Sequence, residues 1–225
     1  MNSRLKHKVI VSVQAMPNEP LYRKECMTAM MQSVVKGGAG GLRVAGVRDV
    51  KIAKELFTVP VIGITKPDVL PKNWKNIVYI TPTIEDVIAL VKAGADVIAF
   101  DGTLRKRQGC TLEDIIKYVK INKRISMADI SNLDEGLECE RLGADIISTT
   151  LAGYTNTSEL SGSTPDFDLL KKLVKNVSIP VILEGRIWTP DEVKKAFDLG
   201  AYAVVIGSAI TRPQLITKRF INYND

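Results

Sequence analysis

The sequence is short of histidine and cysteine, and each shortage excludes a class of function. Its one histidine, His7, precedes the first apolar segment, so a Ser–His or Cys–His pair at a distant site is excluded, and so is a histidine general base. The three cysteines, Cys26, Cys110 and Cys139, are far apart. This spacing gives neither a disulfide framework nor a zinc pattern, and it indicates reduced thiols.

Long hydrophobic runs are also missing, because no apolar stretch approaches the about 18 residues that a membrane span needs. The basic start followed by residues 9–13 resembles a signal peptide. The apolar stretch is too short, however, and no small-residue cleavage site follows it. We therefore expect a cytoplasmic protein that does not bind membranes.

Aromatic residues make up only 6% of the chain, and the net charge is +6. Together these two features decide whether the positive charge indicates nucleic-acid binding. The basic residues are interleaved with acidic ones along the chain, and only Arg105–Arg107 form a cluster. With no aromatic stacking surface and no known module, we expect no nucleic-acid partner. Solvated helix faces explain the excess charge most simply, and attraction of an anionic substrate is the second explanation.

The chain does contain a weak internal repeat, in which a helical stretch ends at a glycine and a buried strand follows. Its glycines, Gly38, Gly94, Gly143 and Gly200, are separated by 56, 49 and 57 residues. Each is predicted to end a helix in a left-handed conformation, which is cheap without a Cβ. A spacing near 50 corresponds to two β/α units, so four such pairs predict eight units.

Continuous apolar runs give the same count, since parallel strands are covered on both faces. They predict strands at 9–14, 41–44, 61–65, 96–100, 125–129, 145–149, 181–184 and 203–206. A ninth run, 77–80, is taken as an accessory strand. Helix starts are predicted at Thr83, Thr111, Thr164 and Thr189. The fold class is therefore α/β, a single parallel (β/α)8 TIM barrel over residues 1–225.

Polar residues follow the predicted strands, at the end of a barrel where active sites lie. Two cations and three carboxylates are expected to face one mouth and to perturb one another's pKa values. These residues are Arg43, Lys66, Asp101, Asp129 and Glu184.

The last two units carry the pattern of a barrel phosphate site, in which glycines let the backbone approach an anion. Gly185 follows the seventh predicted strand, and Gly207 and Ser208 follow the eighth. Arg212 can add a charged contact. Tight turns without a ligand are the alternative explanation.

Acid–base chemistry at this rim falls to lysine and carboxylates. A semi-buried Lys66 near Arg43 is expected to have a depressed pKa and to act as a base. Such a base suits proton abstraction beside a carbonyl, with Arg43 holding the enolate oxygen. A metal held by Asp101, Asp129 and Glu184 is disfavoured because no histidine is near, and the sequence has no dinucleotide-binding fingerprint. We expect no metal and no cofactor.

Seven segments in combination resemble the bacterial N-acetylmannosamine-6-phosphate 2-epimerase family, in order and over almost the whole chain. They are 12–15, 62–66, 105–107, 127–131, 149–155, 184–187 and 207–213.

The resemblance implies a cofactor-independent isomerase that interconverts N-acetylmannosamine 6-phosphate and N-acetylglucosamine 6-phosphate in sialic acid breakdown. It makes Lys66 the acid/base at C2 and Glu184 its partner carboxylate. Substrate-binding residues are then Gln14, Arg43, Asp129, Thr150, Tyr154 and Arg186, and phosphate-binding residues are Gly185, Gly207, Ser208 and Arg212.

The sequence departs from this family at three places. Val13 stands where cysteine is expected, Gly102 stands where alanine is expected, and the segment 154–165 is longer and more polar. Two other functions stay open. One is a phosphosugar aldolase or decarboxylase in which Lys66 forms a Schiff base, and the other is a non-catalytic sugar-phosphate sensor.

The C-terminal segment 214–225 is amphipathic. It is expected either to close the bottom of the barrel or to pack on a second copy. Because twofold dimers are the commonest oligomers, we expect a homodimer.

Overall fold

The computed structural model describes residues 3–158 and 163–222. Eight parallel strands close into one barrel in the order β1 to β8. Their bounds are β1 Val9–Val13, β2 Gly41–Ala45, β3 Val61–Ile64, β4 Val97–Asp101, β5 Ile125–Asp129, β6 Ile146–Ser148, β7 Val181–Glu184 and β8 Ala203–Ile206. The TIM barrel and all eight predicted strands are confirmed, and each strand end lies within one residue of its predicted position.

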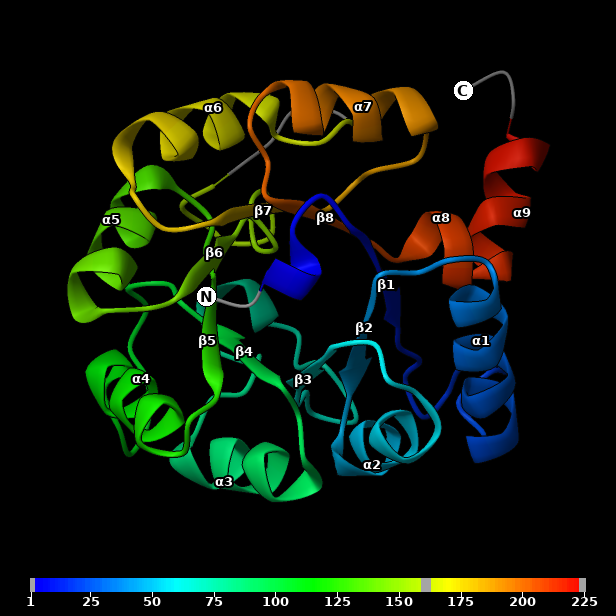
Figure 1. Ribbon diagram of the computed structural model, residues 1–225, viewed down its shortest axis with the longest axis horizontal. Helices are drawn as coiled ribbons and strands as arrows, with labels where there is room; N and C mark the ends of the chain where they lie inside the picture. Colours follow the sequence, from blue (N-terminus) through cyan, green and yellow to red (C-terminus); the bar gives the residue numbers. More distant parts are fainter. Residues whose placement is uncertain (1–2, 159–162, 223–225) are drawn as a thin grey trace.

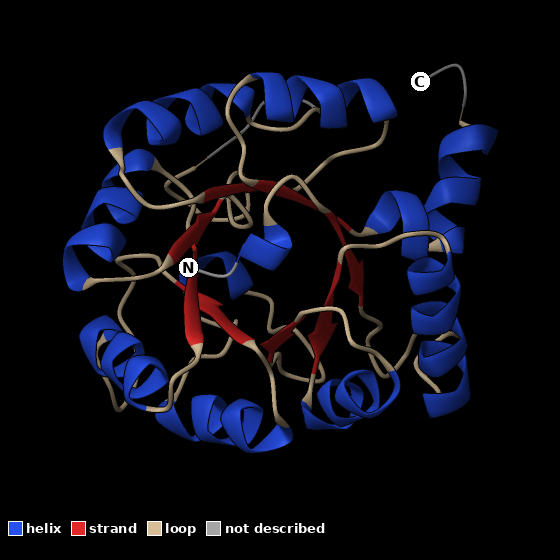
Figure 2. Cartoon of the chain, viewed as in Figure 1, coloured by secondary structure: helices blue, strands red, loops and turns tan. Residues whose placement is uncertain are grey.

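A ring of helices surrounds the strands (Figures 1 and 2). The helices are α1 Lys24–Lys36, α2 Val47–Leu56, α3 Ile84–Ala93, α4 Leu112–Ile121, α5 Leu133–Leu142, α6 Phe167–Asn176, α7 Pro190–Asp198, α8 Ser208–Thr211 and α9 Pro213–Ile221. Within the described ranges, each helix is too short or too polar to cross a lipid bilayer.

Helix ends follow the sequence signals in most units. Thr83, Thr111 and Thr189 each form a capping box with the acidic residue three positions on. The prediction at Thr164 is wrong, because the Asp166 side chain accepts from the Leu169 N–H and α6 starts at Phe167. Asp166, directly before the helix, therefore acts as the cap in place of Thr164, two residues earlier.

The four repeat glycines, Gly38, Gly94, Gly143 and Gly200, are confirmed as left-handed residues after helices, with φ of 98°, 93°, 92° and 93°. At Gly200 the surroundings also require glycine, since an added Cβ would lie 2.9 Å from Val174 Cγ1.

The predicted accessory strand at 77–80 is wrong. A 3₁₀ turn, Trp74–Asn76, is followed by a segment that forms no strand, although the Asp101 N–H of β4 donates to the Ile80 carbonyl at 2.9 Å. Tyr79 and Ile80 are buried against the barrel interior, and Thr81 N–H donates to the Thr65 carbonyl. The apolar run reflects burial over the barrel mouth rather than sheet pairing.

Apolar side chains form two layers. One lies inside the barrel and includes Ile10, Ile62, Met127 and Ile182. The other lies between the strands and the helices. Gly102 belongs to this packing, because an added Cβ there would lie 2.9 Å from Ala128 Cβ.

The N-terminal 3₁₀ turn Ser3–Leu5 closes the bottom of the barrel, with Leu5 fully buried in the interior layer. Of the two alternatives for the C-terminal segment, closure of the barrel bottom is contradicted, since α9 lies outside the ring next to α8 (Figure 1), and packing on a second copy stays a prediction. His7 also lies at the bottom, where its backbone N–H donates to Tyr202.

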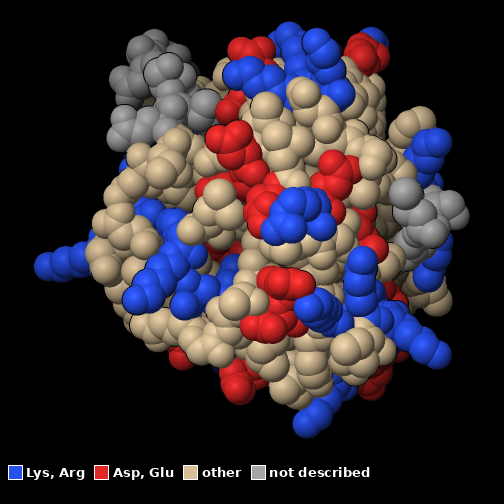
Figure 3. Space-filling view, turned by 90° about the vertical axis from the view of Figure 1, so that its left-hand side faces the viewer, with Lys and Arg blue, Asp and Glu red and all other residues tan. Residues whose placement is uncertain are grey.

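On the face in Figure 3, basic and acidic side chains are interspersed. This mixed pattern matches the explanation of the net charge as solvated helix faces.

Candidate active site

Strand periodicity places the site above the apolar interior. Because side chains alternate along a strand, residues two positions apart point to the same side. Ile10, Ser12 and Gln14 therefore form one inward series along β1 and the residue that follows it, and Ile62, Ile64 and Lys66 form another along β3 and just beyond its end. Each series begins apolar and ends polar at the carboxyl end of its strand.

These polar residues surround a cavity of about 500 Å³. Ten of the twelve predicted site residues line it, namely Gln14, Lys66, Thr150, Tyr154, Glu184, Gly185, Arg186, Gly207, Ser208 and Arg212. The other two, Arg43 and Asp129, lie under the cavity and are 1% and 0% exposed. Lys66 and Glu184 thus face one shared space.

Arg43 forms the floor of the site. Its Nη1 and Nη2 donate to Asp129 at 3.0 and 2.5 Å, and Nη1 also lies 3.0 Å from Glu184 Oε2. Burial alone would lower the pKa of Arg43, but the charges of Asp129 and Glu184 raise it above its ordinary value. Arg43 therefore stays charged.

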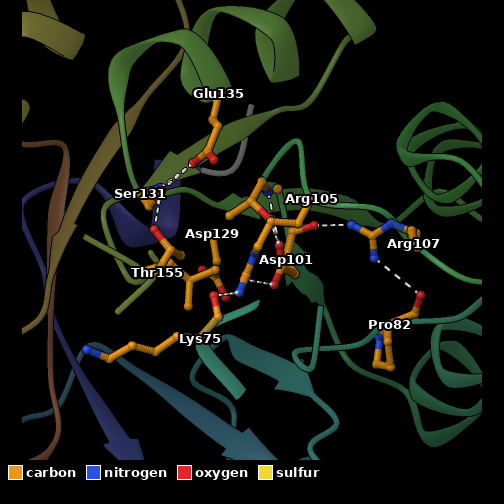
Figure 4. Close-up of polar contacts among 12 residues, drawn as sticks. Lys75, Pro82, Asp101, Arg105, Arg107, Asp129, Ser131, Glu135 and Thr155 are labelled. Carbon is orange, nitrogen blue, oxygen red and sulfur yellow. Dashed lines mark hydrogen bonds and ion pairs between the residues drawn. The ribbon is translucent and has the colours of Figure 1, made fainter. Parts of the chain in front are cut away.

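The expectation that five charged groups face one mouth is wrong in part. Only Lys66 and Glu184 do so. Asp101 is fully buried, and its carboxylate is bound by Thr103 at 2.6 Å and by Arg105 at 2.7 Å (Figure 4). Burial raises the pKa of Asp101 although Arg105 opposes the shift.

Lys66 has the electrostatics expected of it. Burial and the nearby Arg43 lower its pKa to about 8. Its Nζ donates to Gln14 Oε1 at 2.9 Å, and Gln14 Nε2 donates to the Ser12 hydroxyl at 2.7 Å. The amine is thus oriented by a neutral side chain, while Glu184 and Asp129 compensate part of its charge from a distance.

Glu184 is shifted in the opposite direction. Burial raises its pKa to about 7, against the lowering effect of Arg43. The Thr150 hydroxyl lies 3.1 Å from Glu184 Oε2 and 2.7 Å from Asp129 Oδ1. A lysine that can lose its proton and a carboxyl group that can keep one therefore share the cavity near neutral pH.

Two glycine turns form the other end of the cavity. Gly185 has φ of 105°, and a Cβ added there would meet nothing within 4 Å. Gly207 directly precedes α8, whose first N–H groups have no intrahelical partner. Arg212 lines this end and is paired with Glu19.

Arg186 is held against the loop after β6. It has φ of 58° and donates to the Ala152 carbonyl at 2.8 Å. Its guanidinium lies 4.4 Å from the centre of the Tyr154 ring. The loop continues into residues 159–162, so part of the long segment 154–165 lies outside the described residues.

The sequence reasoning did not identify eight further lining residues. Four of them have polar groups, Ser12, Tyr79, Trp188 and Thr211, and four are aliphatic, Ile80, Ile187, Val205 and Leu215. Ser12 could have been found from strand periodicity, because it lies two positions before Gln14. Tyr79 was obscured by the assignment of its segment to a strand.

The fold and the rim cavity define a TIM-barrel enzyme. Residues 27–224 match the family model described as "Putative N-acetylmannosamine-6-phosphate epimerase". The chain belongs to this family.

Curated relatives named "Putative N-acetylmannosamine-6-phosphate 2-epimerase" match over nearly their full length. One from Clostridium perfringens is 49% identical over 96% of this chain and 96% of the relative. One from Clostridioides difficile is 46% identical over 98% of this chain and 97% of the relative.

Solved structures agree. That of the N-acetylmannosamine-6-phosphate 2-epimerase from Clostridium perfringens superimposes with a TM-score of 0.92 at 47% identity, covering 97% of this chain and 94% of that chain. A thiamine phosphate pyrophosphorylase from Pyrococcus furiosus, at 17% identity and a TM-score of 0.62 over 96% and 93%, shares the fold alone.

Proposed function

We propose that the protein is an isomerase that interconverts N-acetylmannosamine 6-phosphate and N-acetylglucosamine 6-phosphate at C2, without a cofactor, in the breakdown of sialic acid. The observation that carries the proposal is the shared cavity of Lys66 and Glu184, bounded by glycine turns suited to a phosphate. The names of the relatives support the substrate.

In the proposed reaction, the open-chain aldehyde form is bound with its phosphate on the backbone of Gly185, Gly207 and Ser208. Neutral Lys66 removes the C2 proton, and the electron pair of that bond moves to the C1 carbonyl oxygen as an enolate. A proton then returns to the opposite face of C2. Since its pKa is raised to about 7, Glu184 can serve as the partner acid and base.

Arg43 takes a different part from the one first expected of it. Both terminal nitrogens are engaged by carboxylates below the cavity. We therefore propose that Arg43 orients Glu184 and lowers the pKa of Lys66. Its positive charge also contributes to the stability of the enolate. Asp129 and Thr150 hold the same array in place.

The experiment that tests the function is an NMR time course with N-acetylmannosamine 6-phosphate in deuterated water. The proposal expects N-acetylglucosamine 6-phosphate to appear with deuterium at C2. Epimer formation without deuterium incorporation would contradict exchange of the abstracted proton with solvent at Lys66. Absence of any product would contradict the function.

Borohydride trapping separates this reaction from the Schiff-base alternative. An aldolase or decarboxylase that used Lys66 would be trapped as a covalent adduct in the presence of substrate. An epimerase of the proposed kind gives no adduct, so a mass increase on the peptide that contains Lys66 would favour the alternative.

A homodimer in the cytoplasm completes the proposal. On α9, the side chains of Phe220 and Ile221 are 78% and 68% exposed, which supports association through this helix. The three free cysteines support a reducing compartment. Light scattering tests the dimer, and a monomeric mass at micromolar concentration would contradict it.

A further inference from the structure

Tyr79 presents a hydroxyl group to the cavity that no described residue binds. The residue is 8% exposed and lines the cavity. Its hydroxyl forms no hydrogen bond with any residue of 3–158 or 163–222, and it is not among the sealed atoms without a partner. Because a buried polar group seldom stays unpaired, this hydroxyl is available to a bound molecule.

The backbone next to Tyr79 places it beside β4, because the Asp101 N–H donates to the Ile80 carbonyl at 2.9 Å. Tyr79 interacts electrostatically with Asp101, Asp129 and Arg43, which come from β4, β5 and β2. Burial raises the pKa of Tyr79, so the group remains a neutral donor. In the closed barrel β4 lies four strands from β8, and Tyr79 therefore stands across the cavity from the glycine turns after β7 and β8.

The chain holds Tyr79 rigidly. The Trp74 ring meets the Tyr79 ring edge-on at 6.0 Å and lies 6.4 Å from Tyr154. We call Trp74, Tyr79 and Tyr154 the aromatic wall. Arg105 holds the turn Trp74–Asn76, which carries Trp74 of this wall. The Arg105 Nη1 donates to the Lys75 carbonyl at 2.9 Å, and its Nη2 binds Asp101 (Figure 4).

The proposed substrate has one group that matches this wall. With the phosphate on the glycine turns and C2 beside Lys66, the acylamino substituent on C2 extends toward the far side of the cavity. It carries a carbonyl oxygen, which needs a donor, and a methyl group, which needs an apolar surface. The wall offers the hydroxyl groups of Tyr79 and Tyr154, of which that of Tyr79 belongs to the more buried residue, and Ile80 beside it adds an apolar side chain.

We propose that Tyr79 determines specificity for the N-acyl group, its hydroxyl donating to the acyl carbonyl oxygen while Ile80 and Tyr154 enclose the methyl group. This assignment rests on the proposed function, because it takes the position of C2 from the role of Lys66. Tyr79 is a binding residue here and takes no part in proton transfer.

Calorimetric binding of two ligands to Tyr79→Phe tests the assignment. N-acetylglucosamine 6-phosphate carries the acyl group, and glucose 6-phosphate has a hydroxyl group in its place. Loss of one hydrogen bond is expected to weaken the binding of N-acetylglucosamine 6-phosphate about tenfold. The binding of glucose 6-phosphate should weaken less than about twofold. Tyr118→Phe, on helix α4 away from the cavity, should change neither affinity.

Other outcomes overturn the assignment. Equal weakening of both ligands would place Tyr79 on a shared part of the sugar, and unchanged affinities would remove it from binding. Unchanged affinities with a large fall in kcat would make its hydroxyl a donor to the reacting oxygen. Failure of the proposed function is recognised separately, because the wild-type protein would then incorporate no deuterium at C2.

Discussion

Arg43 Nη1 lies 3.0 Å from Glu184 Oε2, and this contact joins the buried floor of the barrel to the cavity above it. On its other side Arg43 binds Asp129, which is fully buried. The position of the carboxylate that faces Lys66 therefore depends on a guanidinium group that lies beneath the cavity and is 1% exposed.

Removal of Arg43 should be strongly destabilising. In Arg43→Met, Asp129 and Glu184 stay buried without their cation, and the free energy of unfolding should fall by about 3–5 kcal/mol. Urea denaturation measures the change. Arg141→Met serves as the control, because its ion pair with Glu138 is exposed and its loss should leave stability unchanged. A similar small effect at Arg43 would contradict the importance of the buried array.

The pH dependence of activity should report the depressed pKa of Lys66. Lysine acts as a base only when neutral, so the rate at which the C2 proton exchanges with deuterated water, which needs Lys66 alone, should rise with pH through a midpoint near 8 and level off above it. An ordinary lysine would give a midpoint near 10.5. A profile without a rising limb between about pH 7 and 9 would remove Lys66 from the role of base.

The carboxylate beside Lys66 should shift that midpoint in a defined direction. The negative charge of Glu184 raises the pKa of Lys66. Glu184→Gln removes the charge, so the midpoint for the residual activity should move to lower pH. A shift to higher pH would show that the two groups do not interact as the structure indicates.

Replacement of Lys66 itself should separate chemistry from binding. In Lys66→Ala, exchange of the C2 proton with deuterated water should cease, while the affinity for N-acetylglucosamine 6-phosphate persists because the phosphate contacts remain. Lys72→Ala, an exposed lysine in the following loop, is the matched control and should retain full exchange. Exchange that persisted in Lys66→Ala would assign the proton transfer to another group.

Arg212 should contribute to phosphate affinity. Loss of a charge-assisted contact is worth about 1.5–3 kcal/mol, so Arg212→Met should bind N-acetylglucosamine 6-phosphate about 10- to 100-fold more weakly. Binding of N-acetylglucosamine, which lacks the phosphate, should be unaffected. Glu19→Gln tests the competing ion pair, and removal of that partner should strengthen phosphate binding. Equal losses for both sugars would contradict a phosphate role.

Periodicity in the sequence was sufficient for the fold. The left-handed glycines at 94 and 143 and the threonine caps at 83 and 111 are local signals, so they could be read without tertiary contacts. The segment 77–80 was misread because burial over the barrel mouth and burial in a sheet both select apolar residues.

The sequence by itself determined which residues reach the carboxyl end of the barrel, since strand direction and the two-residue alternation of side chains fix this locally. Only the tertiary structure decided their depth. It placed Arg43, Asp101 and Asp129 under the cavity and left Lys66 and Glu184 facing it. It also brought Tyr79 over the mouth of the barrel. Both outcomes depend on charge pairing and loop packing between residues far apart in the chain, which local sequence patterns do not contain.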